Sequence, residues 1–360
     1  MVGVGCISDI YLHNFKNVFR DVEIVALCDL IKERALNAQK KYNVPKVYDT
    51  MEELFADDEI DVVLNLTRPY QHFAVSKAAL LAGKHVYSEK PLGVDLDEGR
   101  ELVKIAEEKG LWLGGAPDTF LGSAIQSCRE LIDNGLIGDI VGGRFVMAGR
   151  GPESWHPDPD FFYQRGGGPL FDMGPYYITC MINLLGGIKS VYGYAKTSYP
   201  ERLITAAPHV GEIIHVNVPT HIEAILNFAC GVSVSLLTSF DVYNTCQTNI
   251  ELYGTKGTLY VPDPNCFGGT IRFFNGEKGK TEEYPLAFDY SENSRLLGLD
   301  DMCAAIEQKR PGRTTYRQTF HVLEVMCGIA ESARTGEVYK MTSHFEREAP
   351  MDKKLPHGCL

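Results

Sequence analysis

The stretch Gly3-Val4-Gly5-Cys6-Ile7-Ser8 decides the fold of the first part of the chain. It is followed by a segment whose apolar residues recur at helical spacing, namely Ile7, Ile10, Tyr11, Phe15, Val18 and Phe19. A glycine turn that opens a helix in this way is typical of a dinucleotide-binding βαβ unit, with Ser8 here in place of the third glycine. We therefore expect Gly3, Gly5, Cys6, Ile7 and Ser8 to hold a pyrophosphate at the start of the helix.

Asp29 ends the next β-rich run, where an acidic side chain accepts hydrogen bonds from the hydroxyls of an adenosine ribose. A carboxylate at this place repels the 2′-phosphate of NADP, so the predicted cofactor is NAD. Only Met1 and Val2 precede the glycine motif, whereas a strand usually takes about five residues. Either the first strand is short or the true start lies upstream.

Residues 1–117 alternate β-rich runs with amphipathic segments, the pattern of an α/β Rossmann domain with a parallel sheet. The expected strands are Val22–Cys28, Val62–Leu66, His85–Ser88 and Leu111–Gly114. The capping pair Thr50 and Glu53 opens one of the helices.

Residues 118–293 have a different sequence pattern, with long β-rich runs that predict an α+β domain on a large, open, mostly antiparallel sheet. The runs are Ile140–Met147, Val191–Thr197, Ile213–Val218, Glu223–Phe228, Val232–Leu237, Asn249–Tyr253, Thr258–Val261 and Thr270–Phe274. Gly254-Thr255-Lys256-Gly257 joins two of them as a hairpin loop. Helices are expected over 294–345, packed back on the first domain, and 346–360 is expected to be a loose tail.

The composition excludes several classes of protein. A net charge of −12 without any basic run argues against a nucleic-acid partner. The ten cysteines lack C-x-x-C spacing, which predicts reduced, mostly buried thiols and a cytoplasmic protein. No apolar stretch is long enough to predict a membrane span.

At Ser88-Glu89-Lys90-Pro91 a β-rich run ends at the carboxyl edge of the parallel sheet, where open α/β folds bind ligands. Lys90 is therefore expected to be a cation in the cleft, the alternative being an ordinary surface lysine.

From these motifs the chain resembles the family of glucose-fructose oxidoreductase, inositol dehydrogenase and MocA-like proteins over nearly its whole length. The matching pieces are Gly3-x-Gly5 with Asp29, Thr67-x-Pro69 with His72, Glu89-Lys90-Pro91, Gly166-Gly167-Gly168 with Asp172-x-Gly174, and Gly254-Thr255-x-Gly257-Thr258. The resemblance implies a nicotinamide cofactor bound between a Rossmann domain and a second domain whose sheet often forms an oligomer interface.

The resemblance also implies roles for individual residues. Lys90 would hydrogen-bond the substrate hydroxyl and the cofactor ribose, while Asp172 would orient the substrate. Glu89 would support the loop, and a cis peptide is expected between Lys90 and Pro91. Thr67, Pro69 and His72 would border the nicotinamide, although a purely structural His72 is an equal alternative.

The family usually has a histidine four residues after the aspartate, and this chain has Tyr176 there. We expect Tyr176 to carry the proton, with the charge of Lys90 lowering its pKa. The alternatives are that Tyr177, His156 or water carries it.

The loop Glu153-Ser154-Trp155-His156-Pro157 contains an indole ring, which can stack on a sugar ring, and an imidazole, which can contact a hydroxyl. Packing is an equally good explanation for Trp155 and His156. Asp118 and Arg165 are expected substrate contacts by location alone. We predict no metal site, because the spacing of His156, Asp158 and Asp160 in a proline-broken loop does not suit ligand geometry.

The leading interpretation is an NAD-dependent oxidoreductase that transfers a hydride at a ring hydroxyl of a sugar, glycoside or inositol. Two alternatives are a glycosidase or lyase that uses bound NAD transiently and a non-catalytic NAD-sensing regulator. A homo-oligomer, dimer or tetramer, is expected through the open sheet of the second domain.

Overall fold

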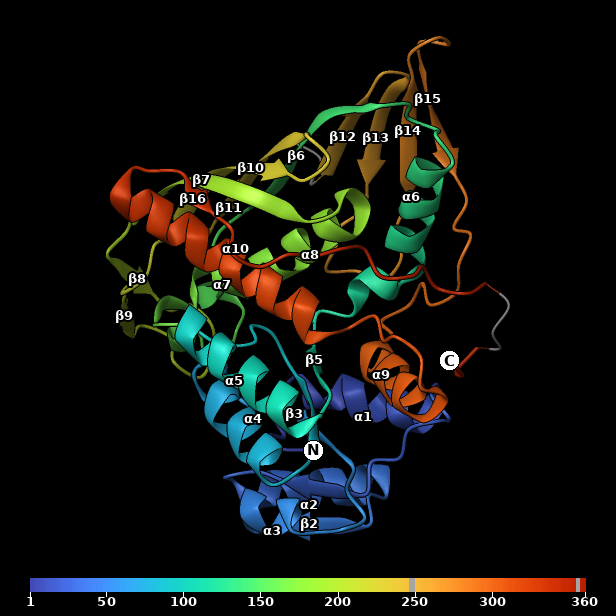
Figure 1. The fold of residues 1–360 in the computed structure, drawn as a ribbon. Coiled ribbons are helices and arrows are strands. Elements are labelled where there is room, and N and C mark those ends of the chain that lie inside the picture. The colour runs from blue at the N-terminus through green and yellow to red at the C-terminus, as the bar shows by residue number, and fades with distance from the viewer. Residues whose placement is uncertain (246–249, 354–356) are drawn as a thin grey trace.

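The computed structural model describes residues 1–245, 250–353 and 357–360. Figure 1 shows the first domain, in blue and cyan, below a broad sheet, with the helices of the second domain between them. The predicted strand run that begins at Asn249 and the cysteine at position 246 lie partly or wholly outside the described residues.

The first domain has the predicted parallel sheet. The strands β1 (Ala26–Cys28) and β2 (Lys46–Tyr48) form one pair, and β3 (Val62–Asn65), β4 (His85–Ser88) and β5 (Leu113–Gly115) form a second group. Val2 joins the groups through single parallel bridges to Cys28 and Asn65. The first strand is therefore short, which was one of the two alternatives. The strand β2 was not expected from the sequence.

Five helices cover this sheet, namely α1 (Ser8–Asn17), α2 (Lys32–Tyr42), α3 (Met51–Phe55), α4 (His72–Leu81) and α5 (Leu96–Lys109). The predicted capping box is confirmed at α3: Thr50 Oγ1 accepts from the amide of Glu53, and the Glu53 carboxylate accepts from the amide of Thr50.

The second domain is built on a nine-stranded sheet of order β15-β14-β13-β12-β6-β11-β10-β7-β16. Only β6 and β11 pair in parallel, so the mostly antiparallel prediction is confirmed. The strands are β6 (Ile140–Ala148), β7 (Ile188–Lys196), β10 (His221–Phe228), β11 (Ser233–Ser239), β12 (Ile250–Gly254), β13 (Gly257–Val261), β14 (Ile271–Asn275), β15 (Lys280–Tyr284) and β16 (Tyr339–Lys340).

Two details of this sheet differ from the sequence prediction. Ile213–Val218 was expected in the main sheet, but β9 (Ile213–His215) pairs with β8 (Glu201–Leu203) in a separate ribbon. The edge strand β15 was missed because its residues are largely polar. The predicted hairpin is confirmed, with Gly254 opposite Gly257 across the β12–β13 turn.

Helices cover one face of the sheet. They are α6 (Ser123–Asp133), α7 (Gly168–Asp172), α8 (Gly174–Leu185) and α10 (Tyr316–Thr335). All of α8 is buried, and each fully buried leucine or isoleucine contributes about 1.5–3 kcal/mol. A Cβ at Gly193 would lie 2.5 Å from the carbonyl oxygen of Ile329, so glycine lets α10 pack directly on β7.

The C-terminal region corrects two predictions. The helix α9 (Leu297–Gln308) packs on the first domain as expected, but α10 lies mainly across the sheet of the second domain and also reaches α5. The tail is not loose where it is described. Met351 and Leu360 are buried, and the amide of Gly358 donates to the Tyr290 hydroxyl at 3.1 Å.

None of the nine described cysteines forms a disulfide, in line with the prediction of reduced thiols. Only three of them, Cys28, Cys128 and Cys180, are buried, so the prediction of mostly buried thiols was wrong. In the described ranges, no helix is both long and apolar enough to cross a membrane.

Candidate active site

The glycine loop leaves an open backbone surface in front of α1. Gly3 has a φ of 92°, and a Cβ there would lie 2.7 Å from the carbonyl oxygen of Leu66, so the position requires glycine. A Cβ at Gly5 would meet nothing within 4 Å. Cys6 is exposed, Ile7 is half-buried, and Ser8 Oγ donates to the carbonyl of Gly5 at 2.7 Å. The loop therefore fits a pyrophosphate laid against the start of the helix.

Asp29 stands directly after β1, beside this loop. Its Oδ2 accepts from the amide of Val4 at 2.6 Å and its Oδ1 from the amide of Ile31 at 2.7 Å. The carboxylate is half-buried, and its two oxygens retain acceptor capacity for further donors. Asp29 thus fits the predicted ribose contact, and it also fastens the glycine loop, a role that the sequence did not reveal.

Lys90 follows β4 and lies opposite Asp172, at the end of α7. The Nζ of Lys90 donates to Asp172 Oδ1 at 2.8 Å and to the Asp172 carbonyl at 2.6 Å. The two side chains are 15% and 21% exposed, so the pair is shielded but still reachable. Burial alone lowers the pKa of Lys90, but Asp172, Tyr176 and Glu89 together outweigh it and hold this pKa above the ordinary value.

The predicted cis peptide between Lys90 and Pro91 is confirmed. Glu89 stabilises this turn through hydrogen bonds. Its carboxylate accepts from the amide of Lys90 at 3.0 Å and from the Tyr11 hydroxyl of α1 at 2.8 Å. Glu89 is only 7% exposed, and it ties the lysine turn to the helix that follows the glycine loop.

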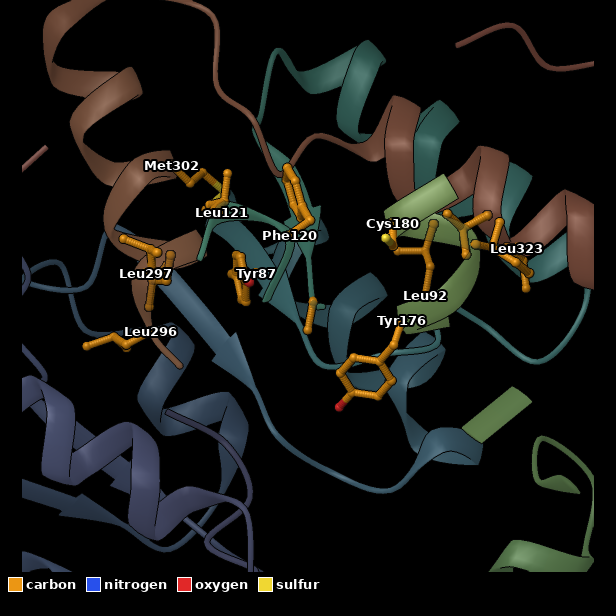
Figure 2. Packing of buried hydrophobic residues seen from close by; sticks show 14 of the residues in the cluster. Tyr87, Leu92, Phe120, Leu121, Tyr176, Cys180, Leu296, Leu297, Met302 and Leu323 are labelled. Carbon is orange, nitrogen blue, oxygen red and sulfur yellow. The ribbon is translucent and has the colours of Figure 1, made fainter. Parts of the chain in front are cut away.

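Tyr176 lies in the first turn of α8, with its ring centre 5.0 Å from Lys90 Nζ. Figure 2 shows the ring at the margin of the buried cluster, with its hydroxyl directed away from Leu92 and Cys180. Burial raises the pKa of Tyr176, while the positive charges of Lys90 and Arg295 lower it. The predicted effect of Lys90 is present, but burial outweighs it.

Arg295 is the site residue that the sequence did not reveal. It precedes α9 in the chain, yet its positive charge lowers the pKa of Tyr176, at the first turn of α8. No motif or spacing marks a single arginine in a loop, because only the docking of the two domains brings it here.

Thr67 and Pro69 are half-buried near the end of β3, and the Thr67 hydroxyl donates to Asn65 Oδ1 at 2.7 Å. His72 is 1% exposed, and its ring nitrogens lie 2.7 Å from the carbonyl of Pro91 and 2.9 Å from that of Thr67. Burial lowers the pKa of His72. These contacts fit the structural alternative, in which His72 joins two loops.

The two residues expected by location to contact substrate, Asp118 and Arg165, have partners within the protein. Asp118 is 1% exposed, and its Oδ2 accepts from the amides of Leu296 and Gly298 at the start of α9, each at 3.1 Å. Burial raises the pKa of Asp118 to about 6. Arg165 is largely exposed and pairs with Asp95 at the start of α5. Asp118 thus holds a helix and Arg165 joins the two domains, while their contact with substrate stays a prediction.

The loop that carries Trp155 and His156 contains two 3₁₀ turns, Pro152–Ser154 and Asp160–Tyr163. Trp155 is 67% exposed, which leaves its ring free for stacking. His156 Nδ1 accepts from the amide of Asp158 at 3.0 Å, and its ring packs edge-on against Phe162. Asp158 in turn pairs with Arg68, which ties this loop to the first domain.

A cavity of about 330 Å³ lies elsewhere in the second domain, and neither Lys90, Asp172 nor Tyr176 lines it. Its walls are Arg150, Glu153, Ser154, Tyr199, Glu201, Arg202, Leu203 and Thr205. The chemistry gathers instead where β4, α7 and α8 meet, because there Lys90 is hydrogen-bonded to Asp172 and lies beside the ring of Tyr176, on which the charge of Arg295 also acts.

Comparison with known proteins agrees with this geometry. Residues 1–114 match the model described as "Oxidoreductase family, NAD-binding Rossmann fold", and residues 125–260 match the GFO/IDH/MocA C-terminal domain. The chain belongs to the Gfo/Idh/MocA oxidoreductase family. The resemblance read from the motifs is therefore confirmed, and so is the fold of two domains that it implied.

Within the Gfo/Idh/MocA family, the chain is 30% identical to trans-1,2-dihydrobenzene-1,2-diol dehydrogenase of Bos taurus over 287 residues, which cover 79% of each chain. It is 27% identical to D-xylose dehydrogenase of Paenarthrobacter nicotinovorans over 45% of this chain and 43% of that protein. A levoglucosan dehydrogenase solved with NADH and levoglucosan has the same fold, with a TM-score of 0.80, 18% identity and coverage of 95% and 98%.

Proposed function

We propose that the chain is an NAD-dependent dehydrogenase that oxidises a hydroxyl on the ring of a sugar, glycoside or inositol. The observation that carries the proposal is the group of Lys90, Asp172 and Tyr176 at the carboxyl end of β4, next to a glycine loop that fits a dinucleotide. NAD, when bound, supplies the hydride acceptor.

The residues of this group divide the remaining work. Lys90 presents an ammonium to the substrate oxygen and stabilises it as the negative charge develops. Asp172 holds that ammonium in place by accepting two hydrogen bonds from it, one at its carboxylate and one at its backbone carbonyl. Tyr176 takes the hydroxyl proton, because its oxygen points away from the packed cluster and its ring lies beside Lys90 Nζ. Trp155, which is exposed, offers an apolar face for the ring.

The relatives support a substrate with neighbouring hydroxyls on a ring. The printed names of two of them give a ring diol and D-xylose, and the solved relative holds levoglucosan. All three are small, uncharged and carry vicinal hydroxyls. We therefore place the substrate among neutral cyclic polyols and sugars, and NAD ahead of NADP because of Asp29.

The test is a screen of cyclic sugars, glycosides and inositols with the purified chain, following NADH formation and product mass together. The proposal expects a keto product and one NADH for each molecule oxidised. Hydrolysis of a glycoside without net NADH would instead support the lyase alternative. Tight NAD binding with no turnover of any member would support the sensor.

We also propose that the enzyme assembles with further copies of itself through the outer face of the large sheet. This face is opposite the helices. It exposes Tyr192, Tyr194 and Ile225 on the paired strands β7 and β10, and Tyr253 and Phe274 farther along the sheet on β12 and β14. Exposed apolar side chains of this kind suit an interface. Light scattering should give a mass of at least twice 40.0 kDa, and a mass near 40.0 kDa at micromolar concentration would refute it. The unpaired thiols of the described residues favour a reducing compartment, the cytoplasm.

A further inference from the structure

The ion pair of Lys90 and Asp172 joins two domains, so it depends on how the domains meet. Lys90 follows β4 in the first domain, and Asp172 is the last residue of α7 in the second. Lys90 Nζ lies 2.8 Å from Asp172 Oδ1, and a hydrogen bond of this kind is normal only up to about 3.2 Å. A shift of about half an ångström between the two segments would therefore weaken the pair.

Gly166 brings the segment before α7 into direct contact with the first domain. Its φ is 84°, and a Cβ there would lie 2.4 Å from Cγ1 of Val94 and 3.6 Å from Cβ of Pro69. Val94 is buried, and it belongs to the turn that continues from Lys90 and Pro91 toward α5. The backbone of the second domain thus rests on the turn that carries Lys90, at a place where no side chain fits.

Arg165, the neighbouring residue, adds an ion pair to this contact. Its guanidinium pairs with Asp95 and also lies 3.7 Å from Oε1 of Glu98. Both carboxylates are already fixed at the start of α5, because Asp95 Oδ1 accepts from the amide of Glu98 at 2.9 Å and Glu98 Oε2 accepts from the amide of Val94 at 2.8 Å. The arginine of the second domain therefore binds a preformed pair of carboxylates.

We propose that Gly166 and Arg165 are positioning residues: they seat the segment before α7 on the turn after Lys90, and so hold Asp172 within reach of the Lys90 ammonium. This inference rests on the proposed function, in which Asp172 orients that ammonium. The two contacts are close along both chains, since residues 165 and 166 shortly precede Asp172 and residues 94 and 95 shortly follow Lys90. Contact at the glycine therefore sets the distance between the lysine and the carboxylate.

Hydrogen–deuterium exchange of a peptide that spans residues 164–176 tests this docking without substrate. Within it the amide of Gly167 donates to the carbonyl of Gln164 at 2.8 Å, and the amide of Met173 donates to that of Pro169 at 3.1 Å. These amides exchange when the segment opens locally, so the exchange rate follows the population of the undocked segment.

Gly166→Ala should raise the exchange rate of this peptide at least about tenfold, because the new methyl group overpacks against Val94. Arg165→Gln should raise it about two- to fivefold, as expected for the loss of an exposed ion pair, and Arg165→Lys should stay closer to the parent.

Two variants away from the contact are matched controls. Gly336→Ala also places alanine at a positive φ, 75°, but its Cβ would meet no atom within 4 Å, so it tests backbone strain without a clash. Arg334→Gln removes an equally exposed ion pair, with Glu331, at the end of α10. Both should leave the exchange of the 164–176 peptide at the parent level.

Kinetics with a substrate from the screen test the consequence for the reaction. The maximal rate, kcat, should fall at least about tenfold in Gly166→Ala, while the affinity for NAD stays at the parent value, because the displaced Asp172 no longer orients Lys90 as charge develops. Arg165→Gln should lower kcat about two- to fivefold, and Arg165→Lys should restore most of it.

The inference is overturned if exchange stays at the parent level in both site variants, or if each control changes it as much as its matched variant. An increase in exchange with unchanged kcat would also overturn it. If Gly166→Ala does not fold, the comparison of Arg165→Gln with Arg334→Gln decides alone. Because exchange is read without turnover, a failure of the proposed dehydrogenase activity would leave the docking result unaffected.

Discussion

Replacing each of the two glycines of the first loop by alanine should have opposite effects on stability and on NAD affinity, which allows a sharp test of the cofactor site. In Gly5→Ala the new Cβ meets no atom within 4 Å, so the free energy of unfolding should stay within about 0.5 kcal/mol of the parent value. The same methyl group would occupy the surface over which the pyrophosphate approaches the backbone. We expect the affinity for NAD to fall at least tenfold, which corresponds to about 1.4 kcal/mol.

Gly3→Ala is the matched control. There the Cβ would stand 2.7 Å from the Leu66 carbonyl oxygen at a φ of 92°, so the fold itself should lose about 1–3 kcal/mol or more. Calorimetric titration with NAD and urea unfolding of both variants measure the two quantities separately. The reasoning is refuted if Gly5→Ala binds NAD as tightly as the parent, or if it is destabilised as much as Gly3→Ala.

Three further changes test other parts of the account. Tyr176→Phe should reduce the oxidation rate by about 10²–10⁴ while leaving NAD binding intact, as measured by steady-state kinetics and titration; near-normal turnover would transfer the proton role to His156 or water. NAD should bind at least about tenfold more tightly than NADP, and Asp29→Ala should narrow that ratio; equal dissociation constants in the parent would contradict the assignment. Neither carboxylate oxygen of the buried Asp300 has a hydrogen-bond partner in the described part of the chain, and burial raises its pKa to about 7. A raised pKa means that protonated Asp300 favours the folded state. The contribution is complete below the unfolded pKa of about 4 and is lost as the pH rises to about 7. The free energy of unfolding from urea melts should therefore fall with pH across this range, and Asp300→Asn should make that fall smaller.

The parts of the site that lie at the ends of regular elements were predictable from sequence. Lys90 follows a recognisable buried strand, and the glycines and Asp29 stand at fixed places in a βαβ unit. In such units local pattern determines three-dimensional position, because the carboxyl ends of parallel strands meet at one edge of the sheet.

Residues in loops were not predictable in the same way. Asp118 and Arg165 were expected to contact substrate, but the first holds two amides of α9 and the second pairs across the domains. Arg295 reaches Tyr176 only after the chain has folded back from the second domain. These contacts join segments far apart in sequence, and no periodicity or spacing encodes them.

Weakly patterned segments escaped prediction for a related reason. The edge strand β15 is largely polar, so hydrophobic alternation does not mark it, and the C-terminal segment is anchored by a few isolated contacts such as that of Met351 with Gln126. In both cases tertiary contacts, not local propensity, determine the structure.

The central claim is that Lys90, Asp172 and Tyr176 support removal of a hydride from a ring carbon that bears a hydroxyl. The most direct measurement uses a substrate from the screen, deuterated at that carbon, with mass spectrometry of the cofactor from the parent and from Lys90→Ala. The account predicts that deuterium appears in the reduced cofactor with the parent chain, and that transfer is abolished in a folded Lys90→Ala variant that still binds NAD. Deuterium retained in the product of the parent, or undiminished transfer in Lys90→Ala, would contradict it.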